Sequence, residues 1–590
     1  MIQDKLSEEQ RIAVKEQGNV ILTACPGSGK TRVIIHKLAY EVEKIPEHSK
    51  KKIIALTFTV RASEEIFKRL NALGINNNRI WSGTLHAFCL EWILKPYSSY
   101  LPELNNGYSI ADEAFCNDLI SNLKEKNGLR QFDDVNLRFN RDGSFAELKY
   151  IQKKLLIEYH DILKSKKMID FELILLYSYR LLTAFPKIAK TLSNIFKLIC
   201  VDEYQDTQDL LYAIISSIIN SGSNTSLFLV GDTDQAIYAS LGGVAKSIDE
   251  IRFEINGKKI EALTLTGNYR SSQRIIDFYK HFQTQEIDIK ALGANALEKG
   301  MITFNDTIKS ADVVNEIARL IQISLDKGVS EDEICVLVPQ WWLITSISRK
   351  LRALLPDVHF DASGLAPMSK NRENIWHKLS CLLLTQPSPK IYSLRYKWAT
   401  EFVELFQYLT STQFNEEYFE ARNLLRLINS IKSDETEGID YLDDCFDQFF
   451  EAVEIDYNKF SQLVEYRELF FKNIEARLND PEFKVPSDII SFKSFYREMA
   501  GVVINTCIGV KGEEYETVIA YGLLNGYIPH WNDIFSGNAV DASNKLMYVI
   551  CSRAKTNLHL ISEIGRTTRR GDALITTPEL ESKIFDYDDV

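Results

Sequence analysis

The segment ACPGSGKT, Ala24–Thr31, contains two glycines, a lysine and a threonine in an order that can hold a phosphate chain. Glycine tolerates the backbone angles of such a turn, and the N–H groups that open the next helix favour negative charge. Lys30 would reach the outer phosphates and Thr31 would ligate Mg²⁺. Ala24 replaces the first glycine of the strict pattern, and a glycine-lysine turn also occurs by chance. The predicted nucleotide-binding residues of this turn are Pro26, Gly27, Ser28, Gly29, Lys30 and Thr31.

Two adjacent acids, Asp202 and Glu203, end the apolar stretch KLICVDE. Ligands collect at the carboxyl ends of parallel strands, so Asp202 can hold Mg²⁺ while Glu203 orients or deprotonates the attacking water. In isolation, two such acids are equally typical of a helix N-cap. Downstream of a Gly-Lys-Thr turn, they favour hydrolysis over nucleotide binding alone.

Transfer of a γ-phosphate also needs arginines, because negative charge develops during the reaction. Arg270 in GNYRS and Arg553 in CSRAK are the candidates. Each follows a predicted strand or opens a helix in the second α/β domain, whereas Lys30 and Asp202 belong to the first. Catalysis would therefore require the two domains to close on one nucleotide. Taken singly, each arginine is more typical of a protein surface.

Alternating strands and helices are predicted to position these residues. Apolar strands and helices alternate over the first ninety residues and again near both acids, a pattern typical of a parallel sheet covered by helices. Two stretches, from about Glu91 to Phe171 and from about Asn371 to Ala500, are helical instead. We therefore expect two α/β domains, each interrupted by a helical insertion. The strands are predicted at NVILTA, KIIALTFT, LICVDE, SLFLVGD, ALTLTGN, MITFND, EICVLVP, VVINTC, TVIAYG and LHLIS.

The composition is that of a globular protein with several domains. The chain has 590 residues, of which 45% are apolar and 25% charged, which excludes fibrous and largely disordered classes. It contains no run of eighteen apolar residues, and its N-terminus lacks the pattern of a secretory signal. We therefore expect a cytoplasmic protein that does not associate with membranes. The nine cysteines include no Cys-x-x-Cys pair and are interpreted as small apolar residues.

The net charge of −12 argues at first against a polyanionic partner. However, the segment from Asp434 to Asp456 contains ten carboxylates and no lysine or arginine, so the remainder of the chain is nearly neutral. Such a run is typical of a solvated helical face, and a protein-binding surface is the alternative.

Several separated blocks between Leu6 and about Ser562 resemble the superfamily 1A helicases related to UvrD, PcrA and Rep. LSEEQ resembles the motif that reads adenine, which implies that Gln10 contacts the base with Arg32 nearby. VDEYQDT and VGDTDQAIY resemble the acid and coupling motifs, which implies that Gln235 lies at the γ-phosphate and Tyr238 against a DNA base. LTFTVRASEEI and SGTLHAF resemble early DNA-contacting motifs, which implies roles for Thr57, Phe58, Thr59, Thr84 and His86.

The remaining blocks lie in the second half of the chain. GNYRSS implies that Tyr269 stacks on adenine and that Arg270 is an arginine finger. NTCIGVKGEEYETV implies that Lys511 and Gly512 lie near the DNA track and Glu514 at the ribose. KLMYVICSRAK implies the second finger, Arg553.

The resemblance implies two RecA-like P-loop domains with parallel sheets, each carrying a helical insertion. It also implies a DNA-dependent ATPase that uses ATP and Mg²⁺ to move along single-stranded DNA, usually 3′ to 5′. Single-stranded DNA and single/double-strand junctions would be its partners. The expected domains are a first motor domain at 1–90 and 176–268 with its insertion at 91–175, and a second at 269–370 and 501–590 with its insertion at 371–500, which includes the acidic run.

Three departures from the family pattern qualify this expectation. After QAIY the family continues with glycine, an aromatic residue, arginine and glycine, but this chain has Ala239, Ser240, Leu241 and Gly242. Ile508 replaces a histidine. The segment after Ser562 lacks an aromatic residue for the tip of a strand-separating hairpin. Its arginines would either touch phosphates or form a solvated basic turn, and they are Arg566, Arg569 and Arg570.

These departures motivate an alternative from another class, a nucleotide- and DNA-sensing regulatory subunit that controls a partner nuclease with little processive unwinding of its own. Helicase-like subunits of phage-defence systems such as Gabija offer an analogy. The chain contains no recognisable nuclease motif of its own. A metabolic P-loop kinase is disfavoured by the early DNA-type motifs and the paired arginines.

Overall fold

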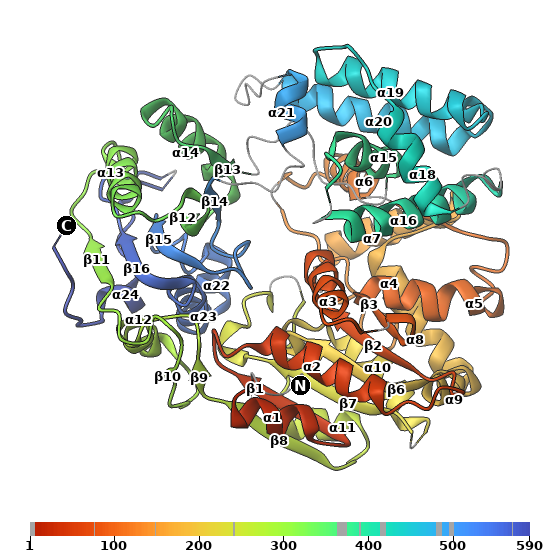
Figure 1. The fold of residues 1–590 in the computed structure, drawn as a ribbon, viewed down its shortest axis with the longest axis horizontal. Helices are drawn as coiled ribbons and strands as arrows, with labels where there is room; N and C mark the ends of the chain where they lie inside the picture. Colours follow the sequence, from red (N-terminus) through yellow and green to blue (C-terminus); the bar gives the residue numbers. More distant parts are fainter. Residues whose placement is uncertain are drawn as a thin grey trace. The chain divides into compact units, whose positions relative to one another are not determined.

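The computed structural model describes residues 6–75, 77–111, 113–131, 133–147, 149–222, 224–239, 242–362, 374–388, 391–412, 420–479, 487–494, 501–568 and 570–589. The chain divides into two compact units, which are drawn in Figure 1. The first contains the residues up to Ser271 and Gln283–Ala296, and the second contains Ser272–Phe282 and the residues from Leu297 onward. Each unit contains one six-stranded parallel sheet, so the predicted α/β class with two parallel sheets is confirmed.

All neighbouring strands of the first sheet run parallel, so the carboxyl ends of its strands lie along one edge. Three adjacent strands, β6, β7 and β1, lead into the predicted acids, the VGDTDQ segment and the glycine turn. The order across the sheet is β3 (Ile80–Thr84), β2 (Lys52–Thr57), β6 (Phe196–Asp202), β7 (Ser226–Gly231), β1 (Asn19–Ala24) and β8 (Ile260–Leu265).

Helices cover both faces of this sheet because its strands are apolar on both sides. Alternate strand residues such as Val20 and Leu22 pack with one set of helices, whereas Ile21 belongs to the core on the opposite face. The first set is α1 (Glu8–Lys15), α2 (Lys30–Glu43) and α3 (Val60–Ala72). The second set is α8 (Phe171–Ala184), α9 (Pro186–Ile195), α10 (Asp209–Asn220) and α11 (Ile248–Glu254).

The helical stretch predicted between Glu91 and Phe171 is present in the first unit. The helix α4 (Leu85–Phe88) continues directly into a π-helical turn, Cys89–Leu94. The apolar core of this region merges with the core on the α8 face of the sheet. Its further elements are α5 (Lys95–Tyr97), α6 (Glu113–Lys126), α7 (Tyr150–Ser165), and the paired short strands β4 (Ser109–Ile110) and β5 (Met168–Ile169).

The second unit repeats this architecture. Its α13 and α14 share a core with the second sheet, while α12 and α23 contact β16. The strand order is β11 (Met301–Asn305), β16 (Ala554–Ile561), β15 (Tyr515–Tyr521), β12 (Ile334–Val338), β14 (Val502–Thr506) and β13 (Phe360–Ala362). The helices are α12 (Gln273–Tyr279), α13 (Val313–Asp326), α14 (Trp341–Leu354), α22 (Trp531–Ser536), α23 (Ala539–Cys551) and α24 (Pro578–Glu581).

The second helical stretch forms a core of its own that is rich in aromatic residues. The acidic run folds largely into α19, which buries Phe446, Phe449 and Phe450 and leaves its carboxylates exposed or half-buried. Asp443 and Asp447 pair with Arg467 of α20. The helices are α15 (Ile375–Leu384), α16 (Tyr392–Thr410), α18 (Ala421–Ser430), α19 (Gly438–Ala452), α20 (Ser461–Leu478) and α21 (Ile489–Ser494).

Two features differ from the sequence prediction, and a third agrees with it. The edge strands β3 and β13 were not predicted. Residues 269–271 and 283–296 belong to the first unit, because β9 (Gly267–Asn268) pairs there with β10 (Lys290–Ala291). All nine cysteines are buried and form no disulfide, as their interpretation as apolar residues predicts.

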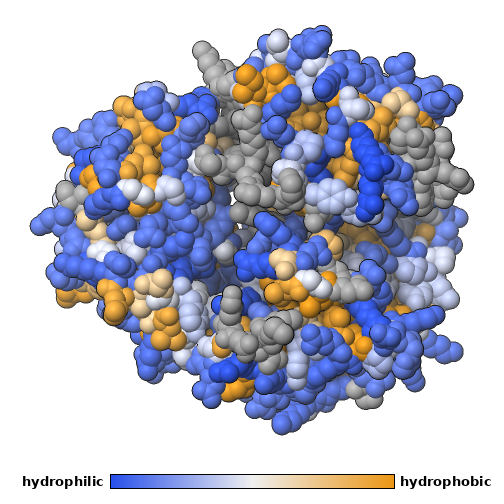
Figure 2. Space-filling view, in the orientation of Figure 1, coloured by the Kyte–Doolittle hydropathy of each residue, from blue (hydrophilic) through white to orange (hydrophobic). Residues whose placement is uncertain are grey.

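The described residues form helices in both units. None of them is long and apolar enough to cross a membrane. The face drawn in Figure 2 is largely hydrophilic, with smaller hydrophobic areas scattered over it.

Candidate functional site

The glycine turn joins β1 to α2 as predicted. Gly27 and Gly29 have positive φ angles of 68° and 80°. A Cβ atom on Gly27 would lie 2.7 Å from the Cβ of Arg270 and 2.7 Å from Oδ1 of Asn268. Both the backbone angle and the crowding therefore require glycine here. Thr31 and Arg32 follow, half-buried, in the first turn of α2.

Lys30 is bound to the predicted catalytic acid. Its Nζ lies 2.8 Å from Oε1 of Glu203. Burial alone would lower the pKa of Lys30, but the carboxylates of Glu203, Asp232 and Asp202 raise it above its ordinary value. The ammonium group is thus held in its charged form at the carboxyl end of three adjacent strands.

Glu203 adopts an unusual backbone conformation, with φ 52° and ψ 49°. A non-glycine residue in the left-handed region is strained and persists only where its surroundings hold it. Its N–H donates to Oδ1 of Asp202 at 3.0 Å, and its Oε2 accepts from Nε2 of Gln205 at 2.6 Å. The end of β6 is therefore fixed by both side chains.

Asp232 follows β7 and is a site residue that the sequence prediction missed. Its N–H donates to Oε1 of Gln205 at 3.0 Å, and its Oδ2 accepts from Nε2 of Gln235 at 2.7 Å. Burial raises the pKa of Asp232 to about 6. The network connects Glu203 through Gln205 and Asp232 to Gln235. The signal was present, because Asp232 ends the apolar stretch SLFLVGD as Asp202 ends LICVD.

Gln10 joins α1 to the glycine turn. It forms a capping box with Ser7, and its Nε2 donates to the carbonyl oxygen of Ser28 at 2.8 Å. A Cβ atom on Gly29 would lie 2.9 Å from this Nε2, which gives a second reason for glycine at that position. Gln10 is therefore next to the turn, as its predicted adenine contact requires.

Asn268 attaches the Tyr269–Arg270 segment to the same turn. Its Nδ2 donates to the carbonyl oxygen of Pro26 at 2.8 Å, and its Oδ1 accepts from the N–H of Arg270 at 2.7 Å. The N–H of Tyr269 donates to the carbonyl oxygen of Gly27 at 2.8 Å, and the Tyr269 side chain is 40% exposed. Arg270 consequently belongs to the first unit, which corrects its predicted placement in the second α/β domain.

Arg553 belongs to the second unit and is only 1% exposed. Its Nε donates to the carbonyl oxygen of Val549 at 3.0 Å, and its Nη1 to that of Glu513 at 3.3 Å. Lys511 is half-buried, while Gly512 and Glu514 are exposed in the turn that precedes β15. Gly512 has a φ of 90° in this turn.

Two of the predicted DNA-contacting residues are aromatic and lie together in the first unit. The rings of Phe58 and Tyr238 stack with centroids 4.6 Å apart and an interplanar angle of 25°. Phe58 is 37% exposed. Burial raises the pKa of Tyr238 to about 12, so its hydroxyl stays protonated at neutral pH.

The three threonines of the early DNA-type motifs have local structural roles. Thr59 and Thr84 cap α3 and α4, while Oγ1 of buried Thr57 donates to the carbonyl oxygen of Thr59 at 2.9 Å. Burial lowers the pKa of His86 to about 4, and its ring packs edge-on against Phe171. His86 is therefore neutral at physiological pH.

Three segments depart from the helicase family pattern: the residues after Tyr238, Ile508, and the segment after Ser562. Of these residues, Ser240, Leu241 and Arg569 lie outside the described part of the chain. An isolated antiparallel bridge between Thr567 and Ala573 closes a short turn that contains Arg570, which is exposed. Arg566 forms an ion pair with buried Glu563. Ile508 is partly exposed.

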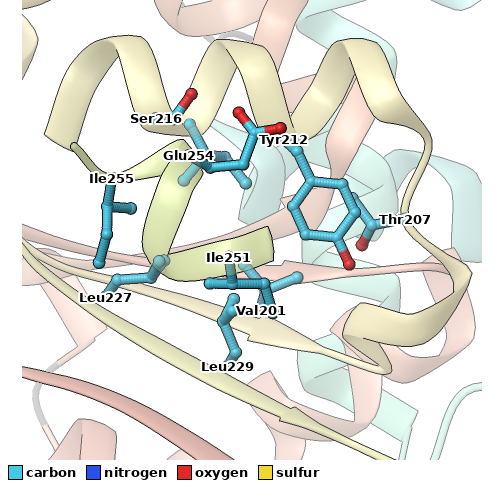
Figure 3. A pocket seen from close by; sticks show the side chains of 10 residues that line it. Val201, Thr207, Tyr212, Ser216, Leu227, Leu229, Ile251, Glu254 and Ile255 are labelled. Atoms are coloured by element: carbon cyan, nitrogen blue, oxygen red, sulfur yellow. The ribbon is translucent and has the colours of Figure 1, made fainter. Parts of the chain in front are cut away.

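Figure 3 shows a cavity beneath α10 and α11, lined mainly by apolar side chains. Its volume is about 10 Å³, which is barely enough for one water molecule. It belongs to the packing between the helices and strands β6 and β7, and is too small for a nucleotide.

The chain is similar in sequence to known DNA helicases. Residues 6–256 match the family described as the UvrD/REP helicase N-terminal domain. The chain is 28% identical to ATP-dependent DNA helicase UvrD1 of Mycobacterium leprae over 303 residues, which are 46% of this chain and 38% of that protein. The chain is 29% identical to ATP-dependent DNA helicase PcrA of Bacillus subtilis over 292 residues, which are 46% of this chain and 38% of that protein.

A longer match extends over both units. The chain is 25% identical over 624 aligned positions to a probable DNA helicase II homolog of Mycoplasma genitalium, covering 94% of this chain and 84% of that protein. In contrast, the match to UvrD1 and PcrA covers only 38% of each relative's length.

Proposed function

We propose that this chain is a UvrD-like helicase of superfamily 1A, which hydrolyses ATP to move along single-stranded DNA and separates duplex strands. The movement proceeds 3′ to 5′, as is usual in the family. The substrates are single-stranded DNA and its junctions with duplex, and the protein acts in the cytoplasm.

The single observation that carries this proposal is the ion pair between Lys30, which follows β1, and Glu203, which follows β6, on either side of β7. A triphosphate held by the glycine turn would compete for the ammonium group of Lys30. The Glu203 carboxylate would then be available to take a proton from water, and Gln205 would keep it oriented.

The side chains next to this pair fit Mg²⁺. Thr31 offers a hydroxyl oxygen and Asp202 a carboxylate oxygen, the hard oxygen ligands that Mg²⁺ prefers. No group of three or more metal-ligating side chains occurs in the described residues, so the protein would supply few ligands and the phosphates and water the rest. The metal would neutralise phosphate charge during transfer.

Arginines and Gln235 would respond to the γ-phosphate. Arg270, whose segment is attached to the glycine turn by Asn268, would neutralise charge from within the first unit. Arg553 is assigned as the second finger on the family resemblance. Gln235 would report hydrolysis to the DNA-binding residues through the chain that leads from Gln235 to Tyr238.

The test is DNA-stimulated ATP hydrolysis by the Glu203→Gln variant. We expect single-stranded DNA to raise the turnover of the unaltered protein strongly, and the variant to lose turnover by about 10²–10⁴-fold while still binding nucleotide. Glu65→Gln, at an exposed glutamate that pairs with Arg69, serves as the matched control. Persistent hydrolysis in Glu203→Gln would show that the base is misassigned, and the lack of any DNA stimulation would exclude the motor.

A second candidate function is a regulatory subunit of a nuclease complex, for example in phage defence. It is favoured by the outward carboxylates of α19 and by the absence of an aromatic residue between Ala239 and Gly243. Strand displacement on 3′-tailed and 5′-tailed duplexes distinguishes the two functions and gives the polarity. Equal unwinding by the isolated chain and by a co-purified complex would exclude the regulatory role.

A further inference from the structure

Arg138, in the segment between α6 and α7, lies against the turn that begins at Tyr238. A Cβ atom on Gly242 would lie 2.4 Å from Nη1 of Arg138 and 2.7 Å from its Cδ. Gly242 has a φ of 91°, and the N–H of Gly243 donates to the carbonyl oxygen of Tyr238 at 3.0 Å. The guanidinium group is therefore packed on the backbone of a turn that the Tyr238 carbonyl closes.

The turn itself brings no positive charge. Residues 239–245 contain no lysine or arginine, and the next cation along the chain is Lys246. Nζ of Lys246 lies 2.7 Å from Oδ1 of Asp209, and it also pairs with Glu254. Its side chain is only 9% exposed, so Lys246 cannot reach a ligand at the turn.

Arg141, three residues after Arg138, is neutralised in the same cluster. Its Nε lies 2.6 Å from Oδ2 of Asp209, and its Nη1 lies 3.1 Å from Oε2 of Glu254. Figure 3 shows the side chain of Glu254, the last residue of α11, beside Ser216 and Tyr212 of α10. Two acids and two bases thus compensate one another and leave Arg138 outside the cluster.

The side chain of Arg138 is oriented but not neutralised. Its Nε donates to Oδ1 of Asn136 at 2.7 Å, which fixes the plane of the guanidinium group. In the part of the chain that the structure describes, Arg138 forms no ion pair, and its two terminal nitrogens form no hydrogen bond. The acid facing it is Glu172, whose pKa burial raises to about 7, so this carboxyl group is only partly charged at neutral pH.

An aromatic surface and a cation thus occur on the two ends of one short turn. Bases stack on rings such as the Phe58–Tyr238 pair without regard to sequence, and guanidinium groups bind phosphate oxygens through paired N–H donors. We propose that Arg138 binds a backbone phosphate of the single strand whose base lies on Phe58 and Tyr238. This inference rests on the proposed function, and it assigns a DNA-binding role to the helical insertion.

The experiment measures the affinity of a fluorescein-labelled oligothymidine for the full chain, without nucleotide, between about 50 and 200 mM salt. Arg138→Ala should weaken binding about tenfold, as the loss of one charge-assisted contact predicts. It should also reduce the slope of log affinity against log salt by about 0.7, the value for one phosphate contact on a single strand. Arg138→Lys should keep the slope, because the charge remains.

Two control variants separate this contact from other effects. Arg130→Ala removes a positive charge from the same insertion, at a side chain that is 85% exposed and pairs with Asp133. It should change neither affinity nor slope by much. Phe58→Ala should weaken binding with no change in slope, because a stacking contact releases no counterions.

The outcomes distinguish this inference from the proposed function. If single-stranded DNA stimulates the ATPase but Arg138→Ala binds DNA as Arg130→Ala does, only the inference is overturned. If the unaltered protein binds no oligothymidine, both are overturned. Thermal melting shows whether Arg138→Ala is misfolded. In that case Arg138→Gln, which retains most of the side chain but not the charge, tests the inference through the slope of log affinity against log salt.

Discussion

Asn268 should control ATP hydrolysis although no chemical step is assigned to it. The Asn268→Ala change removes side-chain hydrogen bonds at a fully buried position. The groups that lose this partner are the carbonyl oxygen of Pro26 at 2.8 Å, the N–H of Arg270 at 2.7 Å and the N–H of Ser271 at 2.8 Å. Together they attach the Arg270 segment to the glycine turn.

The magnitude follows from the burial of these groups. A buried polar group that loses its partner costs about 1–3 kcal/mol, and relaxation brings the sum for three groups toward about 3 kcal/mol. The hydrogen bond from Tyr269 to the carbonyl oxygen of Gly27 remains, so the segments stay joined but can shift. A displacement of about 1 Å at a catalytic group can cost about 100-fold in rate.

The assay is steady-state ATP hydrolysis at saturating single-stranded DNA. We expect kcat/KM of Asn268→Ala to fall about 100-fold, with a lower melting temperature. Asn268→Asp keeps an acceptor for the two N–H groups and should lose less activity. Asn127→Ala, which removes one hydrogen bond to the carbonyl oxygen of Leu123 in the insertion, should leave kcat/KM unchanged. Kinetics of Asn268→Ala equal to those of Asn127→Ala would refute the reasoning.

Two further predictions concern stability and pH. Burial raises the pKa of Asp232 to about 6, so the stability that its protonated form contributes is full below about pH 4 and is lost as the pH rises through 6. Asp232→Asn should therefore be more stable than the unaltered protein at pH 7.5, by about 2–3 kcal/mol in denaturant titrations. An unchanged dependence of stability on pH in the variant would contradict this. Burial would raise the pKa of Asp209, but hydrogen bonds from Arg141 and Lys246 hold it below its ordinary value, so that stabilisation is present at neutral pH and lost on acidification. Arg141→Gln should accordingly lower the melting temperature at pH 7, at a cost of about 1–2 kcal/mol, and the difference should shrink below about pH 4; a constant difference would exclude the ionic explanation.

Local patterns in the sequence were sufficient to predict the strands that lead into the glycine turn and the acids. The glycine turn follows a strand whose residues are apolar on both faces, and a parallel sheet places the residues after its strands at one edge. For this reason Lys30 and Glu203, which are 173 positions apart, could be predicted at one site. Phe58 and Tyr238 were each predicted as DNA contacts from the family resemblance, but their stacking on one another was not predicted.

Contacts between segments without a periodic pattern could not be predicted. The assignment of Arg270 to the first unit depends on the side-chain hydrogen bonds of Asn268 and on a two-residue strand pair, neither of which leaves a signal in local hydrophobicity. The same holds for Arg138, whose position against Gly242 is set by the tertiary packing of the insertion. The contact of His86 with Phe171, which lies far along the chain, likewise leaves no local signal.

The placement of the two arginines has a consequence for how hydrolysis could be coupled to movement. Arg270 is attached through Asn268 to the glycine turn and belongs with that turn to the first unit. Arg553 belongs to the second unit, where carbonyl oxygens of Val549 and Glu513 accept from its guanidinium group. If Arg553 acts as the second finger, as the family resemblance implies, we expect turnover to depend on the second unit through Arg553 and not through Arg270. The family resemblance implies the same role, an arginine finger, for both residues, but the fold assigns them to different units.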